Sequence, residues 1–156
     1  MNIKAKLAAL GLSGALVTGG ALIASHEGKE NPVYLDPVGI LTSCYGHTGP
    51  ELKIGQTFTD EQCLEQLAAD LVKHDKQLRS VVKVTMSEGE HAAYLSAVYN
   101  YGIGNFQTST ALKLLNEGRR KEACVEAIRF VFAQKKFFKG LLNRRIDEAK
   151  ICLKDL

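Results

Sequence analysis

The stretch that decides the fold runs from Ser25 to Thr48 and reads SHEGKENPVYLDPVGILTSCYGHT. Glu27 follows directly on an uncharged segment, so we expect it at the end of a helix. Pro32 comes next, and because proline stops a helix and extends the residue before it, Asp36 belongs to a different element. The two carboxyl groups can therefore face each other across a gap, with the Thr42 hydroxyl close by in the sequence.

Two carboxyl groups that flank one bond are the usual requirement for glycoside hydrolysis. One must be protonated to donate to the leaving oxygen, and the other must be ionised to activate water or to act as a nucleophile. A Glu and an Asp this close in sequence are more often solvated surface charges. The pair alone is therefore a weak indication, and the surrounding sequence decides its weight.

The surrounding sequence resembles the catalytic region of the phage-type lysozymes. The motifs that carry the resemblance are Glu-Gly at 27–28, Tyr-x-Asp at 34–36, Gly-x-x-Thr at 39–42, Tyr-Gly-His-Thr at 45–48, VYNYGIGNF at 98–106, Ser-Thr at 109–110, LNEG at 115–118 and GLLNRR at 140–145. In that family a Glu on a helix, an Asp on a hairpin and a Thr at the end of a strand carry the reaction. The resemblance covers residues 26–156 and places those roles on Glu27, Asp36 and Thr42.

The activity that this resemblance implies is that of an endolysin causing host cell lysis. Its substrate would be the glycan strands of peptidoglycan, cut between N-acetylmuramic acid and N-acetylglucosamine, with inversion at the anomeric carbon. Two rival functions are weighed against it. A lytic transglycosylase needs the Glu but no water held by an Asp, and a non-catalytic wall-binding or membrane-tethered module needs neither. The intact trio of Glu27, Asp36 and Thr42 argues against the second.

The expected fold is α+β and lysozyme-like, with a small antiparallel sheet lobe and a mainly helical lobe joined by a long helix. Glycines and prolines divide residues 33–57 into short apolar runs, which favours hairpins. A capping box at Thr59–Gln62 begins a helix that extends to about Val82. The resemblance suggests an ion pair between Asp70 of this helix and His47, which we interpret as bracing the sheet lobe.

The remaining chain is predicted to be mostly helical. The expected helices cover Ser87–Tyr101, from Thr108 or Ser109 to Gly118, Lys121–Gln134 and Gly140–Leu153, with a tight turn at Gly102–Gly104 above Phe106. In the last helix, the resemblance implies that Arg144 reaches Glu27. A cation there would favour the ionised acid and partial burial would favour the protonated one. The sequence leaves that balance open, along with the alternative of a surface arginine.

The N-terminal segment Leu7–Ala24 carries no charge over 18 residues and follows Lys4 and Lys6. A membrane span needs about 20 mostly apolar residues, and four Gly and five Ala make this run only weakly apolar. We therefore predict an uncleaved N-terminal apolar anchor helix within residues 1–25, ahead of a catalytic domain of residues 26–156. This arrangement resembles the signal-anchor-release endolysins. A cleaved signal peptide and a buried core helix are the alternatives.

The resemblance also implies a means of control. The N-terminal lysines would stay on the cytoplasmic side of the host inner membrane, so that residues 7–24 span it and the catalytic part faces the periplasm. Glu27 would then be tied to the membrane surface, out of register with Asp36. Release into the periplasm would let its helix dock and complete the site.

Composition narrows the possible partners. The net charge is +3 and apolar residues make up 46% of the 156 residues, which fits one domain with a sizeable core and a mild attraction to anionic walls or membranes. The sequence has no basic block with interleaved aromatics, no Gly-rich phosphate loop and no His pair at metal-ligand spacing. We therefore predict no nucleic-acid binding, no cofactor and no metal, and we expect a monomer.

The four cysteines are Cys44, Cys63, Cys124 and Cys152, and none forms a C-x-x-C pair. Export would permit disulfides, and four cysteines allow three pairings. Cys44 follows the sheet strand and Cys63 opens the next helix, while the other two lie on the last two helices. We favour the pairs Cys44–Cys63 and Cys124–Cys152.

Overall fold

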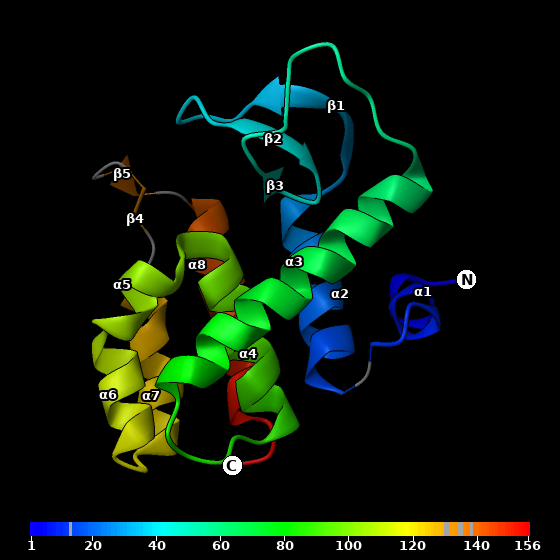
Figure 1. The fold of residues 1–156 in the computed structure, drawn as a ribbon. Helices are drawn as coiled ribbons and strands as arrows, with labels where there is room; N and C mark the ends of the chain where they lie inside the picture. The colour runs from blue at the N-terminus through cyan, green and yellow to red at the C-terminus, as the bar shows by residue number, and fades with distance from the viewer. Residues whose placement is uncertain (13, 130–131, 134–135, 138) are drawn as a thin grey trace.

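The structure, a computed structural model, describes residues 1–12, 14–129, 132–133, 136–137 and 139–156. A small antiparallel sheet lobe lies above a helical body, and the long helix α3 runs between them (Figure 1). The helices are α1 (Ile3–Ala9), α2 (Ala15–Glu27), α3 (Asp60–Val81), α4 (Glu88–Tyr101), α5 (Ile103–Gln107), α6 (Thr110–Asn116), α7 (Arg120–Glu126) and α8 (Lys139–Leu153). The strands are β1 (Glu30–Leu35), β2 (Leu41–Cys44), β3 (His47–Thr48), β4 (Phe132–Ala133) and β5 (Lys136–Phe137). The expected α+β fold with two lobes is confirmed.

The sheet lobe is a three-stranded antiparallel sheet in the order β1-β2-β3. Tyr34 of β1 pairs with Thr42 of β2, and Ser43 of β2 pairs with His47 of β3. The β1–β2 hairpin closes where the Asp36 amide donates to the Ile40 carbonyl at 3.0 Å. This register puts Asp36 at the tip of the hairpin.

Helix α3 begins at the capping box that the sequence predicted. The Thr59 hydroxyl accepts from the Gln62 amide at 3.1 Å, and the Gln62 side chain accepts from the Thr59 amide at 2.9 Å. With 22 residues at about 1.5 Å each, the helix is long enough to reach from the sheet lobe through the helical body. Its apolar face is buried at Leu67, Leu71 and Leu78.

The core of the helical body forms around α4, which packs against α2, α3 and α8. Fully buried side chains of this core are Leu7, Ile23, Leu67, Leu71, Leu78, Leu95, Val98, Phe106 and Leu115. The tight turn expected over Gly102–Gly104 is instead the start of the short helix α5, and Phe106 of that helix is buried. The core therefore contains side chains from the N-terminal segment as well as from the rest of the chain.

The N-terminal segment differs from the single apolar helix expected over residues 7–24. It forms two helices, α1, which ends at Ala9, and α2, which begins at Ala15. Gly11 has a φ of +91° and Gly14 a φ of +53°. Both values lie outside the right-handed helical range, and glycine adopts them without steric cost. None of the helices in the described ranges is both long and apolar enough to cross a membrane.

The helix expected over Lys121–Gln134 is shorter than predicted. Helix α7 ends at Glu126, a 3₁₀ turn covers Ala127–Arg129, and strands β4 and β5 pair further on. The sequence from 130 to 138 contains four Phe and one Val, residues that favour strands over helices. The predicted end at Gln134 falls outside the described residues.

Candidate active site

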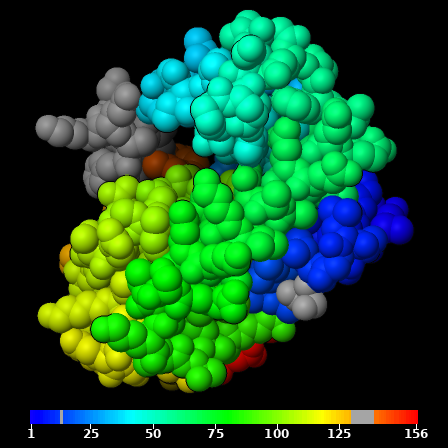
Figure 2. Space-filling model, in the orientation of Figure 1, coloured from blue at the N-terminus to red at the C-terminus, as the bar shows by residue number. Residues whose placement is uncertain are grey.

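A cleft of about 860 Å³ lies between the sheet lobe and the helical body. Figure 2 shows the surface hollowed below the cyan sheet lobe, with the orange start of α8 at the bottom of the hollow. The cleft is lined by His26 and Glu27 of α2, Asp36, Pro37 and Val38 of the hairpin, Asn100 of α4, and Gly140, Leu141, Asn143, Arg144, Ile146, Asp147 and Lys150 of α8. The structure therefore brings Glu27 and Asp36 to one cleft from different elements.

Glu27 is the last residue of α2, which Gly28 ends with a φ of +68°. Its Oε1 accepts a charge-assisted hydrogen bond from Arg144 Nη1 at 2.5 Å, and its side chain is 22% exposed. On the other side lies Gly46, where an added Cβ would come within 2.6 Å of Glu27 Oε2. The carboxyl group is thus fixed between α8 and the β2–β3 turn, with one part open to the cleft.

Asp36 is oriented by the backbone of its own hairpin. Its Oδ1 accepts from the Val38 amide at 2.9 Å and from the Ile40 amide at 2.8 Å. This is the local bonding typical of an Asp that starts a turn. The carboxylate therefore has a fixed position on the rim of the cleft opposite α8.

Thr42 lies in β2 and is only 4% exposed, and it is not among the residues that line the cleft. Its hydroxyl donates to the Ile40 carbonyl at 2.9 Å. A hydroxyl that has used its one hydrogen can still accept. Thr42 is thus placed as an acceptor next to the hairpin that carries Asp36, and the structure does not bring it to the cleft surface with the two carboxyl groups.

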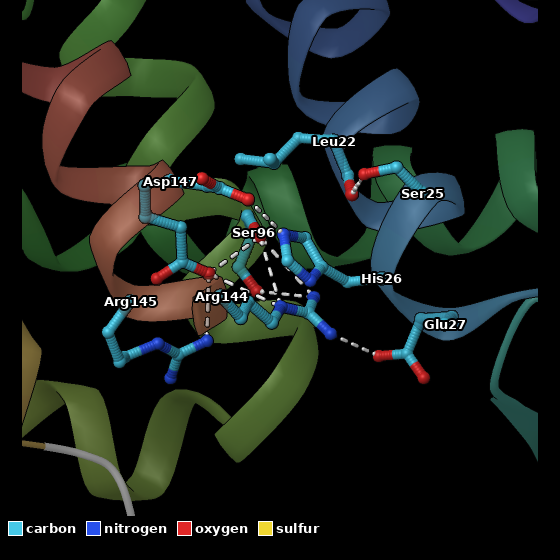
Figure 3. Close-up of polar contacts among 9 residues, drawn as sticks. Leu22, Ser25, His26, Glu27, Ser96, Arg144, Arg145 and Asp147 are labelled. Atoms are coloured by element: carbon cyan, nitrogen blue, oxygen red, sulfur yellow. Dashed lines mark hydrogen bonds and ion pairs between the residues drawn. The ribbon is translucent and has the colours of Figure 1, made fainter. Parts of the chain in front are cut away.

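The expected contact of Arg144 with Glu27 is present, and Figure 3 shows the guanidinium reaching from α8 to the end of α2. Arg144 is 3% exposed, so the surface alternative is wrong. Its Nη2 donates to the Ser96 carbonyl at 3.1 Å and its Nε to Glu148 Oε1 at 3.3 Å. The arginine is therefore held in a buried network before it reaches the cleft.

Sequence reasoning missed several residues of this site. Glu148 and Ser96 are buried and contact Arg144, Gly46 packs on Glu27, and His26 Nε2 lies 2.8 Å from Asp147 Oδ2 at the edge of the cleft. The spacing of Glu148, four residues after Arg144, places both on one helix face and could have indicated that pair. Nothing in the sequence indicated that Ser96 or His26 would meet residues of α8.

A half-buried tyrosine, Tyr99, joins α4 to the turn beside Glu27. The Tyr99 hydroxyl donates to the Tyr45 carbonyl at 2.6 Å. Burial raises the pKa of Tyr99, and the nearby carboxylates Asp70 and Glu27 raise it further, so the phenol stays neutral. The contact fixes the β2–β3 turn, and with it Gly46, against the helical body.

The sheet lobe is also braced through His47. Its Nδ1 lies 2.7 Å from Asp70 Oδ2, the pair that the resemblance suggested, and its Nε2 lies 2.7 Å from Glu51 Oε1. The hydrogen bond with Asp70 raises the pKa of His47 to about 9, against the opposite effect of burial, and Glu51 adds to the rise. The imidazolium thus links the sheet lobe to α3.

Two disulfides complete the frame, with the pairing that we favoured. Cys44–Cys63 joins the end of β2 to α3, and Cys124–Cys152 joins α7 to α8. The first closes a link between the two lobes, and the second fixes the helix that carries Arg144.

A two-lobed α+β body with a carboxyl group on each side of its cleft is the architecture of a lysozyme-type glycoside hydrolase. A family model described as Phage lysozyme matches residues 24–148. The chain belongs to the phage lysozyme family, the muramidases that phages use as endolysins.

Individual relatives agree with this membership. The chain is 40% identical to the SAR-endolysin of Bacteriophage PS119 over 93% of its length and 87% of that protein, and 39% identical to the SAR-endolysin of Enterobacteria phage P21 over 93% and 88%. Among solved structures, the endolysin from Escherichia coli O157:H7 phage FAHEc1 superposes with a TM-score of 0.78 at 34% identity, covering 89% of this chain and 92% of that one.

Two structures of the P1 phage endolysin Lyz extend the comparison of the fold. Its active form gives a TM-score of 0.84 at 21% identity over 96% of this chain and 90% of that one. Its secreted inactive form gives 0.61 at 19% identity over 88% and 94%. The fold of this chain is therefore more similar to the active form.

Proposed function

We propose that this lysozyme-family chain hydrolyses the bond between N-acetylmuramic acid and N-acetylglucosamine, with Glu27 as the general acid. The observation that carries the proposal is the placement of Glu27 and Asp36 on opposite sides of one cleft. Glu27 donates its proton to the leaving glycosidic oxygen. Asp36, fixed by the hairpin amides, takes a proton from the attacking water.

Thr42 has a supporting part in this scheme. Because its hydrogen is used by the Ile40 carbonyl, its hydroxyl can only accept from a water molecule. The attacking water donates to Asp36 and keeps an oxygen lone pair for the anomeric carbon. For this water to donate to Thr42 as well, the Thr42 hydroxyl, which is 4% exposed here, must become accessible from the cleft in the substrate complex. Attack from the face opposite the leaving group inverts the configuration, and on that mechanism the two carboxyl groups in the substrate complex are separated by about 6.5–9.5 Å.

The test compares release of reducing ends from purified wall by wild type, Glu27→Gln, Asp36→Asn and Glu30→Gln. Loss of the general acid is expected to lower the rate about 10²- to 10⁴-fold. Glu30→Gln is the matched control, since Glu30 is an exposed carboxylate in the adjacent strand. Undiminished hydrolysis by Glu27→Gln rules out the assignment of the acid. Anhydro-sugar products from an active Asp36→Asn identify a transglycosylase instead.

We also propose that residues 7–24 first anchor the chain in the host inner membrane, with the N-terminus cytoplasmic, and that release into the periplasm activates it. Relatives named SAR-endolysins support this, as does the fold's greater similarity to the active P1 form. In the described conformation Leu7 and Ile23 are fully buried in the core, so the same segment can support the catalytic domain of residues 26–156 after release.

Ala8→Leu with Ala9→Leu tests this proposal. Both alanines are exposed on α1, so leucines there strengthen a membrane anchor without disturbing the core. The double variant should stay in the membrane fraction and should not lyse cells, while Ala8→Ser with Ala9→Ser, the matched control, should be released. Leucine at Gly19 is less informative, because a Cβ there lies 3.2 Å from the Ala92 carbonyl oxygen. If the double variant lyses cells while it remains in the membrane fraction, the proposal is wrong.

A further inference from the structure

The proposed acid lies against a cation, which is an unfavourable arrangement for a proton donor. Arg144 Nη1 is 2.5 Å from Glu27 Oε1, and the arginine is 3% exposed, so water screens its charge weakly. An unopposed guanidinium at this distance favours the ionised carboxylate. Something must offset Arg144 if Glu27 is to be protonated when substrate binds.

The offsetting group in the structure is Glu148. It lies one turn after Arg144 on α8, is 2% exposed, and accepts from Arg144 Nε at 3.3 Å through its Oε1. The same oxygen accepts from the Ser96 hydroxyl at 2.7 Å, which fixes it in place. The Arg144 guanidinium therefore contacts two carboxyl groups, the partly exposed Glu27 through Nη1 and the buried Glu148 through Nε. Figure 3 shows the Arg144 side chain extending toward Glu27.

A second arginine competes for the same carboxylate. Arg145 is fully buried, and its Nη2 donates to Glu148 Oε1 at 2.8 Å. Burial lowers the pKa of Arg145, and the charge of Glu148 opposes that effect. One buried carboxylate thus divides its charge between two buried guanidinium groups, and only one of them reaches the acid.

We propose that Glu148 is a positioning residue for the acid: as the counterion of Arg144 on the core side, it lets Arg144 hold Glu27 in place without keeping it ionised. This inference rests on the proposed role of Glu27. In this proposal Arg144 orients the Glu27 carboxyl group, and Glu148 offsets the positive charge of Arg144. Arg145 sets how much of the Glu148 charge remains for Arg144.

Among the described residues, other titratable groups also face the two carboxyls. Asp36 of the hairpin lies across the cleft from Glu27 and is left unchanged in every variant below, so it does not alter the comparison between them. The remaining groups are Tyr34 of β1 and Tyr99 of α4 at Glu27, and Tyr94 and Tyr101 of α4 at Glu148, beside the two arginines of α8. Burial is the largest cause raising the pKa of each of these tyrosines, so they stay neutral over the working range. On α2, His26 faces Asp147 instead.

The proposal gives two variants opposite effects. Glu148→Gln leaves Arg144 opposed by Glu27 alone, so the alkaline limb of the kcat/KM profile should move to lower pH by about one unit. Arg145→Met removes the competing guanidinium and gives Glu148 to Arg144 alone, so the limb should move to higher pH, by about half a unit. A purely structural role would lower activity equally at every pH. Glu65→Gln, at an exposed position of α3, controls for the loss of one negative charge.

A direct readout separates this inference from the function on which it rests. In full-length protein with ¹³C-labelled glutamate carboxyls, the resonance absent from Glu27→Gln reports the acid, and its titration should move with the activity limb in both variants. An unmoved Glu27 titration in folded Glu148→Gln overturns the role of Glu148. If that titration moves while the activity limb stays, the role of Glu148 stands and Glu27 is not the acid.

Glu148→Gln leaves Arg145 buried without a carboxylate, which destabilises the fold, so a second variant keeps the test decisive. Arg145→Met with Glu148→Gln removes one positive and one negative charge, so the net charge of the buried cluster of Arg144, Arg145 and Glu148 stays as in wild type. Arg144 still lacks its core-side counterion in this double variant, so the limb should again lie below that of wild type. A limb at the wild-type position in the folded double variant overturns the proposal.

Discussion

Removing the His47 side chain should change how stability depends on pH. The imidazole lies between Asp70 Oδ2 and Glu51 Oε1, at 2.7 Å from each, and its side chain is 16% exposed. The hydrogen bond with Asp70 is the main cause that raises the pKa of His47 from 6.5 to about 9 in the folded protein. A raised pKa means that the stabilising contribution is complete below 6.5 and is lost as the pH rises through 9.

The size of the effect follows from this shift. Each pH unit corresponds to about 1.4 kcal/mol, so the change from 6.5 to about 9 gives about 3 kcal/mol. For a chain of 156 residues, that free energy corresponds to roughly 6–12 °C in Tm. The stabilising free energy from His47 should be almost complete at pH 6, about half of its full value near pH 8, and nearly absent at pH 10.

The pH dependence of this contribution is measured by thermal unfolding between pH 6 and pH 10, monitored by circular dichroism. The Tm difference between wild type and His47→Gln should be large at pH 6 and shrink through pH 8 to pH 10. Glu51→Gln should lose a smaller part, because the Glu51 side chain is 59% exposed and Asp70 remains. Parallel Tm curves for wild type and His47→Gln would show that the imidazolium does not brace the lobes.

Three further predictions follow from single contacts. Gly46→Ala should lower kcat at least tenfold with KM little changed, because the added Cβ would lie 2.6 Å from Glu27 Oε2 and residue 46 has a φ of +75°. Steady-state kinetics on wall fragments measure this change. An unchanged kcat would show that the Glu27 side chain can shift freely. Cys44→Ala with Cys63→Ala should lower the free energy of unfolding by about 3 kcal/mol relative to oxidised wild type, as expected for a 19-residue separation. Urea denaturation measures this, and reduced wild type, which also loses Cys124–Cys152, should be less stable than the double variant. Thr59→Ala should cost about 1 kcal/mol in the same assay through loss of the α3 cap, and Thr59→Ser should restore it.

The parts of the site that could be predicted from sequence are those fixed by local chemistry. Proline after Glu27 and the turn residues around Asp36 separate the two carboxyl groups whatever the rest of the chain does. The capping box at Thr59–Gln62 marks the start of the joining helix for the same reason. The contact of Arg144 with Glu27, 117 residues apart, came only from the resemblance to a family.

The parts that could not be predicted depend on tertiary packing. An apolar run of small residues reads as one helix, but the backbone at Gly11 and Gly14 leaves the helical range and α1 folds back on α2. The early end of α7 was missed because helix periodicity continued past Glu126 into residues that prefer strands. Glu148 was missed because a Glu near two arginines in a helix is ordinarily a solvated surface pair.

The glycines of the N-terminal segment connect the proposed anchor with the folded core. A Cβ at Gly20 would lie 2.7 Å from Leu7 Cδ1 and 2.8 Å from Leu71 Cδ1, and one at Gly19 would lie 3.2 Å from the Ala92 carbonyl oxygen. Helix α2 can pack this closely on α1, α3 and α4 only because these two positions lack side chains. Small residues there also weaken insertion into a bilayer. Larger residues at these two positions would therefore strengthen the proposed anchor and also prevent the helix that ends in Glu27 from packing in the core. The proposed membrane release and the assembly of the cleft thus both require small residues at Gly19 and Gly20.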